Sequence, residues 1–507
     1  MPRSGDATSG LDFAGETEEV AAVAEILDSG EAGGKIIRGG AVRSVGYVGG
    51  ILFGLLATPF MVRHLGVVDF GRYIAVSSLV FIVSGLTEGG LTAIGVREYS
   101  VRDSATGAML IRNLLGLRIV LTGFGVAAAV AFAAAAGYVP VMIAGTAIAG
   151  AGLLLSNYHG AFYVPLSVRL KLGKLAAIDL LRAGLTALFA ILLVVAGARL
   201  LSFFAIPVAV GIVTTAVVLW LVRGMAPWVP SFRLEDWKSL LRDSIPYAAA
   251  TAIGVLYFRV AVILMSVISS DRATGFYGLA FRIIEIVSGV PWLLVSAALP
   301  ILTRAALADA DRMRYTMQRL FEVALILGVW VALSVGLGSP FAVEVVGGSG
   351  FKSSIAPLSV LGAAMIGTFL VAAWGHGLLA MRRNVSLLVA NLSAFAVGVG
   401  LTIALAPSHG AVGGAIATTA TELWLALAYG VLLVRHRPDL RPEFGILGPL
   451  GVASGIALAL PLLVRTPPVA SVAIATAVYF GTLAALGAIP RELRDAFRLR
   501  NRASGVP

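Results

Sequence analysis

Residues 175–222 read LAAIDLLRAGLTALFAILLVVAGARLLSFFAIPVAVGIVTTAVVLWLV, and the fold follows from the length of the apolar runs in this stretch. A helix needs about 20 mostly apolar residues to cross the ~30 Å hydrocarbon layer of a bilayer, and residues 175–197 and 200–222 each reach that length. Only Ala198 and Arg199 separate the two runs. The stretch therefore predicts two antiparallel helices that span a membrane.

The composition of the whole chain supports the same class. Of its 507 residues, 58% are hydrophobic and 13% are charged, whereas soluble domains carry about 25% charged residues. The chain has no cysteine, which excludes disulfide scaffolds, thiolate nucleophiles and cysteine-containing zinc sites. No Walker A motif and no pair of histidines four residues apart occurs. The sequence predicts an integral membrane protein that is not an enzyme and holds no metal or cofactor.

Fourteen apolar windows of this kind predict an all-α polytopic fold with about 14 transmembrane helices. The windows cover residues 41–62, 73–96, 113–136, 139–163, 175–197, 200–222, 244–268, 275–303, 320–345, 355–380, 385–406, 411–434, 445–464 and 468–489. Several windows touch, and the long ones could each form one tilted helix. Twelve spans is therefore an alternative count.

The distribution of lysine and arginine predicts the orientation, because these residues accumulate in cytoplasmic loops. Counted over alternate segments, 27 of them fall on one side and six on the other. The six are Arg63, Arg72, Arg199, Arg272, Lys352 and Arg465. We expect both termini to lie in the cytoplasm. The net charge of +11 is spread over many inner segments, so no nucleic-acid partner is expected.

The windows divide the chain into two lobes with flanking segments. Residues 1–37 form an acidic tail that composition predicts to be disordered, and residues 38–222 form an N-terminal lobe of six spans. Residues 223–243 form a linker, in which Trp237, Leu240 and Leu241 share a face of a short interfacial helix. A C-terminal lobe of six spans (244–434), two further spans (435–490) and a basic tail (491–507) follow.

A short internal repeat relates the two lobes. When residues 71–85 are shifted by 204 positions, six identities appear in fifteen positions. They pair Gly71, Tyr73, Ile82, Val83, Ser84 and Gly85 with Gly275, Tyr277, Ile286, Val287, Ser288 and Gly289. Six spans separate the copies, so both run in the same direction and predict lobes related by an axis along the membrane normal. Two such lobes suit alternating access around a central site.

Ionisable residues inside the predicted spans are the candidate functional residues, because charge there is costly and normally faces a cavity or a partner. Arg259 has no acidic residue within one turn, so a ligand anion is a good candidate partner, and Glu88 likewise has no basic neighbour on its turn. Arg282 and Glu285, three residues apart, either pair or contact substrate. Guanidinium groups bind phosphate bidentately, so an arginine-lined cavity between the lobes would take an anion.

Other charged residues have competing interpretations. Asp179 and Arg182 are spaced to neutralise each other, and Arg118 lies near enough to the cytoplasmic end to extend toward it. Arg43 shares a helical face with a stripe of small residues in the first span, which either packs closely or leaves room for a bulky ligand. The candidate cavity arginines are thus Arg259, Arg282, Arg43 and Arg118.

Several short motifs follow one another in a recognisable order and spacing. They are Arg63-His64-Leu65-Gly66 before Phe70-Gly71-Arg72-Tyr73, Leu91 to Arg97, Ser244-Ile245-Pro246, Tyr257-Phe258-Arg259, Gly275 to Glu285 followed by Leu299-Pro300, and Gly410 to Thr418. Through them residues 38–490 resemble the multidrug/oligosaccharidyl-lipid/polysaccharide (MOP) exporter superfamily, in its polysaccharide-transporter or O-unit flippase branch.

The resemblance implies a flippase of the bacterial inner membrane that moves an undecaprenyl-pyrophosphate-linked oligosaccharide from the inner to the outer leaflet. Arg259 and Arg282 would face the pyrophosphate or acidic sugars, and the partners would be the lipid-linked sugar, membrane lipids, and the polymerase and glycosyltransferases of the pathway. Many relatives carry an acid two residues after Arg259, where this chain has Ala261. Ion coupling would then fall to Glu88, Glu285 or Glu422, or be absent.

Two other functions remain open. A related exporter could carry a peptidoglycan lipid precursor or, with cation coupling, drugs, although a cavity for organic cations favours acids over arginines. A membrane glycosyltransferase or polymerase would need a large outer loop with catalytic carboxylates, and the predicted outer loops are short.

Overall fold

The computed structural model describes residues 31–296, 302, 305, 309–464 and 466–489, and its regular elements there are all helices. Within a bilayer each backbone N–H and C=O must be satisfied inside the segment, which an α-helix achieves. In chain order the elements are α2 (Glu31–Glu88), α3 (Leu91–Tyr99), α4 (Ser104–Ala135), α5 (Pro140–Gly160), α6 (Tyr163–Val168), α7 (Leu172–Val195), α8 (Leu200–Phe203), α9 (Ile206–Leu221), α10 (Leu234–Ile268), α11 (Asp271–Ser296), α13 (Ala310–Gly347), η1 (Ser349–Ser354), α14 (Ile355–Ala380), α15 (Asn384–His436), η2 (Pro438–Leu440), η3 (Phe444–Ile446), α16 (Leu447–Val464) and α17 (Pro468–Ala485).

Eleven helices in the described ranges are long and apolar enough to cross a membrane. The predicted all-α polytopic membrane fold is therefore confirmed, whereas the count of fourteen spans stays a prediction. Two long helices each contain one break between two predicted windows, at Gly66 (φ 69°) in α2 and at Gly410 (φ 53°) in α15. A positive φ is strained for residues with a Cβ atom, which explains why glycine occupies both breaks.

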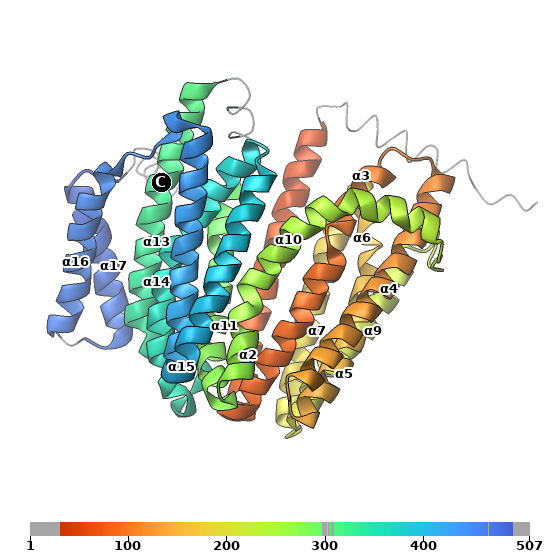
Figure 1. Ribbon diagram of the computed structural model, residues 1–507, viewed down its shortest axis with the longest axis horizontal. Helices are drawn as coiled ribbons and strands as arrows, with labels where there is room; N and C mark the ends of the chain where they lie inside the picture. The colour runs from red at the N-terminus through yellow and green to blue at the C-terminus, as the bar shows by residue number, and fades with distance from the viewer. Residues whose placement is uncertain (1–30, 297–301, 303–304, 306–308, 465, 490–507) are drawn as a thin grey trace, which may run out of the picture.

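The helices form two groups that lie side by side, with a further pair at one edge (Figure 1). The N lobe consists of α2 to α9, and the C lobe consists of α10 to α15. Helices α16 and α17 contact each other and reach the C lobe through α13. The long α2 contacts both α10 and α11, so it forms much of the boundary between the lobes.

The linker between the lobes is part of a longer helix than the sequence suggested. Helix α10 runs without interruption from Leu234 to Ile268, so the expected short interfacial helix is the beginning of the seventh span's helix. Trp237 and Leu240 are buried in an apolar cluster of the N lobe that includes Leu115 and Val222. The same helix therefore begins against the N lobe and ends in the C lobe.

The lobes touch at the end that carries the Gly66 and Gly410 breaks and the start of α11. The charge distribution predicts this end to face outward, and we call it the outer end. A Cβ atom on Gly71 would lie 2.8 Å from the Gly275 nitrogen and would collide with the Asp271 carbonyl oxygen; one on Gly275 would collide with the Val67 carbonyl oxygen. The 204-residue shift relates Gly71 to Gly275 and Val67 to Asp271. The two repeat copies thus cross through equivalent positions, as a local pseudo-twofold axis requires.

Candidate functional site

Polar contacts join the lobes at the outer end. Arg72 of α2 donates from Nε to Oδ2 of Asp271 in α11 at 2.8 Å. Arg63 donates from Nη2 to the carbonyl oxygens of Glu344 and Val345 in α13, at 2.9 and 2.6 Å. The sequence indicated both arginines as outer-loop charges and as members of short motifs, but not as contacts between the lobes. Their positions on α2, beside the Gly66 break, make them links that hold the outer end closed.

An ion-pair triad lies deeper, between α10 and α11. The Arg259 guanidinium donates to Oε1 of Glu285, and Arg282 Nη1 lies 2.8 Å from Oε2 of the same carboxylate. Arg259 lies nine residues before the end of α10, and Glu285 lies fourteen residues after the start of α11. At 1.5 Å per residue, both are roughly 14–21 Å from the outer end, near the middle of the hydrocarbon layer.

Aromatic rings from both lobes surround the Arg259 guanidinium. Its Cζ atom lies 4.4 Å from the ring centre of Phe81 in α2 and 5.4 Å from that of Phe281 in α11. The side chain of Arg259 is only 6% exposed, whereas that of Arg282 is 37% exposed. Arg282 is therefore the accessible member of the triad, and Arg259 is the buried member that contacts both lobes.

The structure gives Arg259 a protein partner where the sequence suggested a ligand anion. Glu285 is 26 residues away on a neighbouring helix, so a search along one turn of α10 could not find it. The expected Arg282–Glu285 pairing is present, and the same carboxylate serves both arginines. Phe81 was missed altogether; it occupies the position that the 204-residue shift relates to Glu285, which is the signal that could have identified it.

A second ion pair lies in the N lobe. Glu88 at the end of α2 contacts Arg118 of α4 at 2.8 Å. Arg118 also donates to Thr92 Oγ1 at 2.7 Å and to the Asn157 carbonyl oxygen at 3.3 Å. The expectation that Arg118 extends to the membrane surface is wrong, because its side chain is 2% exposed. The expectation that Glu88 lacks a basic neighbour holds only for its own turn.

Glu422 lies inside the C lobe rather than between the lobes. It accepts a hydrogen bond from the Tyr257 hydroxyl and another, at 3.1 Å, from Thr368. Glu422 and Thr368 also line a cavity of about 30 Å³ with Thr402, which is large enough for a water molecule. Tyr257 and Thr368 were not singled out from the sequence, because hydroxyl groups on apolar helices have no distinctive spacing.

The remaining candidates fall outside these groups. Asp179 and Arg182 approach to 3.9 Å as expected, and the Tyr163 hydroxyl also donates to Asp179. Arg43 lies in α2, but its side chain lies outside the part of the chain that the structure describes. Over the described ranges, no three acidic or histidine side chains gather in a way that could hold a metal ion.

Comparisons with known proteins agree with this architecture. A family model described as "Polysaccharide biosynthesis protein" matches residues 36–306. The chain is similar to a solved structure of the lipid II flippase MurJ in an inward closed conformation, with a TM-score of 0.71 at 13% identity, covering 88% of this chain and 98% of that one. Among curated proteins, no sequence matches.

Two structures of multidrug resistance MATE family transporters of the MOP superfamily are also similar. The inward-facing conformation gives a TM-score of 0.64 at 14% identity, covering 77% of this chain and 95% of that one. The outward-facing conformation gives a TM-score of 0.54 at 15% identity, covering 80% of this chain and 96% of that one. At these identities the likeness concerns the fold alone.

Proposed function

The chain belongs to the polysaccharide biosynthesis protein family, and we propose on this premise that it is a flippase for a lipid-linked oligosaccharide. Its family and fold are those of transporters and flippases rather than enzymes. The cargo would be an undecaprenyl-pyrophosphate-linked unit of a capsule, exopolysaccharide or O-antigen, moved from the inner to the outer leaflet. The observation that carries this proposal is the Arg259–Glu285–Arg282 triad.

The triad has the chemistry to exchange one anion for another. Its two guanidinium groups share a single carboxylate, which leaves a net charge of about +1 at mid-membrane. A pyrophosphate offers more acceptor oxygens and more negative charge than Glu285, so it can engage both arginines. When no cargo is bound, Glu285 compensates one of the two positive charges, because a buried arginine without any anionic partner is strongly destabilising.

The closed outer end sets the direction from which cargo enters. With Arg63 and Arg72 linking the lobes there, the headgroup reaches the triad from the opposite, inner end while the prenyl chain remains in the bilayer. The cation–π contact between Arg259 and Phe81 joins the triad to the N lobe. Displacement of Glu285 by the headgroup alters that contact, and in this way loading is communicated to the lobe that must move.

Coupling to an ion would use a carboxylate outside the triad. Glu422 is buried with two hydroxyl donors beside a water-sized cavity, which suits a proton or a small cation. Glu88 is bound to Arg118 and is 37% exposed. We favour Glu422 as the coupling residue, because Glu88 already has a cationic partner.

Leaflet-selective labelling of an undecaprenyl-pyrophosphate-linked oligosaccharide in proteoliposomes tests the proposal. We expect Arg259→Ala and Arg282→Ala to abolish transfer while insertion and abundance stay normal. Arg272→Ala is the matched control on α11, because Arg272 is exposed at the outer end and takes no part in the triad. Transfer that persists in both triad variants would show that the triad does not bind the cargo. The same assay with a peptidoglycan lipid precursor in place of the oligosaccharide lipid distinguishes which of the two lipid-linked substrates the protein moves.

A further inference from the structure

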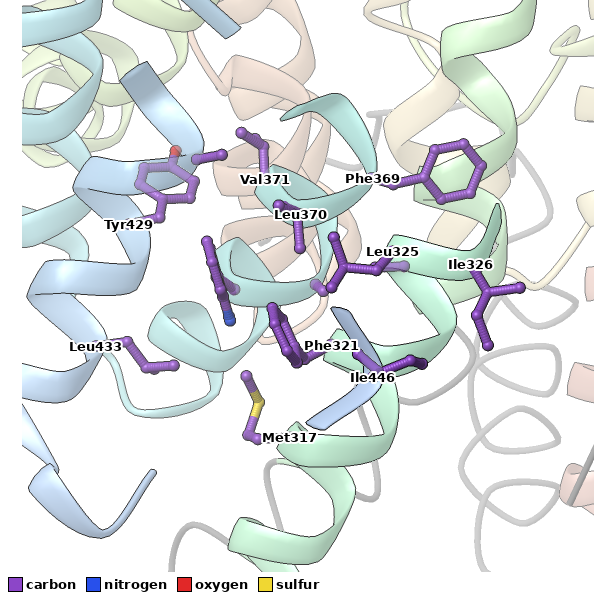
Figure 2. Close-up of a cluster of buried hydrophobic side chains, with 14 of the residues drawn as sticks. Met317, Phe321, Leu325, Ile326, Phe369, Leu370, Val371, Tyr429, Leu433 and Ile446 are labelled. Carbon is purple, nitrogen blue, oxygen red and sulfur yellow. The ribbon is translucent and has the colours of Figure 1, made fainter. Parts of the chain in front are cut away.

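A cavity of about 340 Å³ lies at the inner end of the C lobe, where α13 begins and α15 ends. Its floor is apolar and includes Met317, Phe321 and Leu433. Figure 2 shows Met317 and Phe321 of α13 pointing toward Leu433 of α15. The floor therefore belongs to the largest described apolar cluster of the C lobe and offers a surface for hydrocarbon.

The rim of this cavity is charged and balanced. It carries three arginines and three carboxylates, namely Arg314, Arg319, Arg441, Asp311, Glu322 and Glu443. Arg314 contacts Glu443 at 3.2 Å, and Arg319 contacts Glu322 at 2.6 Å. In the described part of the chain, no hydrogen bond or ion pair holds the guanidinium of Arg441. One cation of the rim is thus available to a ligand.

A second cavity, of about 460 Å³, continues from the first toward α16 and α17. The two share Gln318, Arg319, Glu322 and Glu443, and the second reaches Pro449 of α16 and Leu486 after α17. Gln318 fixes the shared wall, because its amide donates to the Glu443 carbonyl at 3.1 Å and accepts from the Glu443 N–H at 2.9 Å. A ligand with its polar part at the first cavity could therefore lay an apolar chain beside the α16–α17 pair.

These features fit the headgroup region of an inner-leaflet lipid. Basic pockets between helices on the cytoplasmic side bind anionic lipid headgroups, whereas this rim carries acids as well as arginines. The exposed Tyr315 ring marks the interface level. A rim with equal numbers of both charges favours a headgroup that also carries both. We propose that this cavity holds a resident phospholipid with an ammonium–phosphate headgroup, the phosphate on Arg441 and the ammonium on Asp311, because Glu322 and Glu443 already pair with arginines.

Alternative lipids differ in ways that the rim can discriminate. An anionic headgroup would add negative charge to a rim whose charges already balance, and it would bring no cation to Asp311. A choline headgroup has the phosphate but cannot donate N–H hydrogen bonds to the Asp311 carboxylate. The order of retention is therefore phosphatidylethanolamine first, with phosphatidylglycerol and phosphatidylcholine weaker.

Native mass spectrometry of the full-length protein, delipidated in detergent and then given each lipid in mixed micelles, tests this order. We expect Arg441→Ala to weaken phosphatidylethanolamine retention about tenfold, because the variant loses one charge-assisted hydrogen bond to the phosphate. Arg312→Ala removes the same charge from an exposed position outside the cavity and should retain the lipid as wild type does. Arg259→Ala should also retain it, because this site is independent of the transport triad.

Two results would overturn the proposal. One is equal or stronger retention of phosphatidylglycerol or phosphatidylcholine, which would mean that the balanced rim does not select the headgroup. The other is undiminished phosphatidylethanolamine retention in Arg441→Ala at an unchanged melting temperature, which would place the lipid elsewhere. A failure of the flippase assay alone leaves both of these readouts intact.

Discussion

A single methyl group at position 71 is expected to open the outer end of the transporter. The Cβ atom of Gly71→Ala would strike the Asp271 carbonyl oxygen and lie 2.8 Å from the Gly275 nitrogen. Both obstacles are backbone atoms of α11, so no side-chain rotation can relieve them. The strain is relieved only when α2 and α11 separate, and these helices belong to different lobes.

The magnitude follows from the cost of overpacking. Forcing an extra methyl group into a filled contact costs about 1–3 kcal/mol. Because the open outer end does not contain this contact, the cost falls on the closed state alone. The ratio of open to closed molecules should therefore rise roughly fivefold to 150-fold, at 1.4 kcal/mol per factor of ten. Gly275→Ala should act similarly, because its Cβ atom would strike the Val67 carbonyl oxygen.

The lack of natural cysteine makes this shift directly measurable by spin labelling. Labels at Arg199→Cys in the N lobe and Lys352→Cys in the C lobe report the separation of the lobes at exposed outer positions. Gly54→Ala in the same α2 is the matched control, because no atom lies within 4 Å of its added Cβ. A distance distribution that is the same in Gly71→Ala, Gly54→Ala and the parent would refute the reasoning.

Three further changes test the charged groups. Glu285→Gln removes the internal anion of the triad while keeping its shape, so inorganic pyrophosphate should bind about tenfold more tightly by isothermal calorimetry; unchanged binding contradicts the exchange model. Arg118→Met should lower the free energy of unfolding by about 2–3 kcal/mol, which is less than for a fully buried pair because Glu88 is 37% exposed. An unchanged melting temperature would contradict this. Glu422→Gln can still accept from Tyr257, so the protein should fold normally, while transport in proteoliposomes should lose its response to an imposed ion gradient.

The fold could be predicted from sequence because the membrane imposes one local rule. Most described residues of every predicted apolar window lie in a helix, since a backbone in hydrocarbon has few alternatives. The breaks at Gly66 and Gly410 separate windows that the sequence already divided. The repeat, although short, contained Gly71 and Gly275, which meet across the lobe boundary.

The charge pairs could not be predicted in the same way. Periodicity identifies the face of a helix on which a residue lies, but it does not identify the neighbouring helix. Arg259 and Glu88 were each recognised as unpaired within a turn, and each found its partner on another helix, Glu285 and Arg118 respectively. Arg72 pairs with Asp69 on its own turn, but its link to the other lobe, Asp271, lies 199 residues away and could not be found in the same way.

The most informative feature of the repeat is one position at which its two copies carry different residues, Phe81 and Glu285. The 204-residue shift relates Phe81 to Glu285, and both residues contact the same guanidinium of Arg259, one with a ring face and one with a carboxylate. Two carboxylates at these positions would cancel the charge of Arg259 and Arg282 and leave nothing for an anionic cargo. The ring attracts the cation without neutralising it. The two copies of the repeat thus bring two different side chains to one arginine, and the difference between Phe81 and Glu285 leaves that arginine able to bind a phosphate.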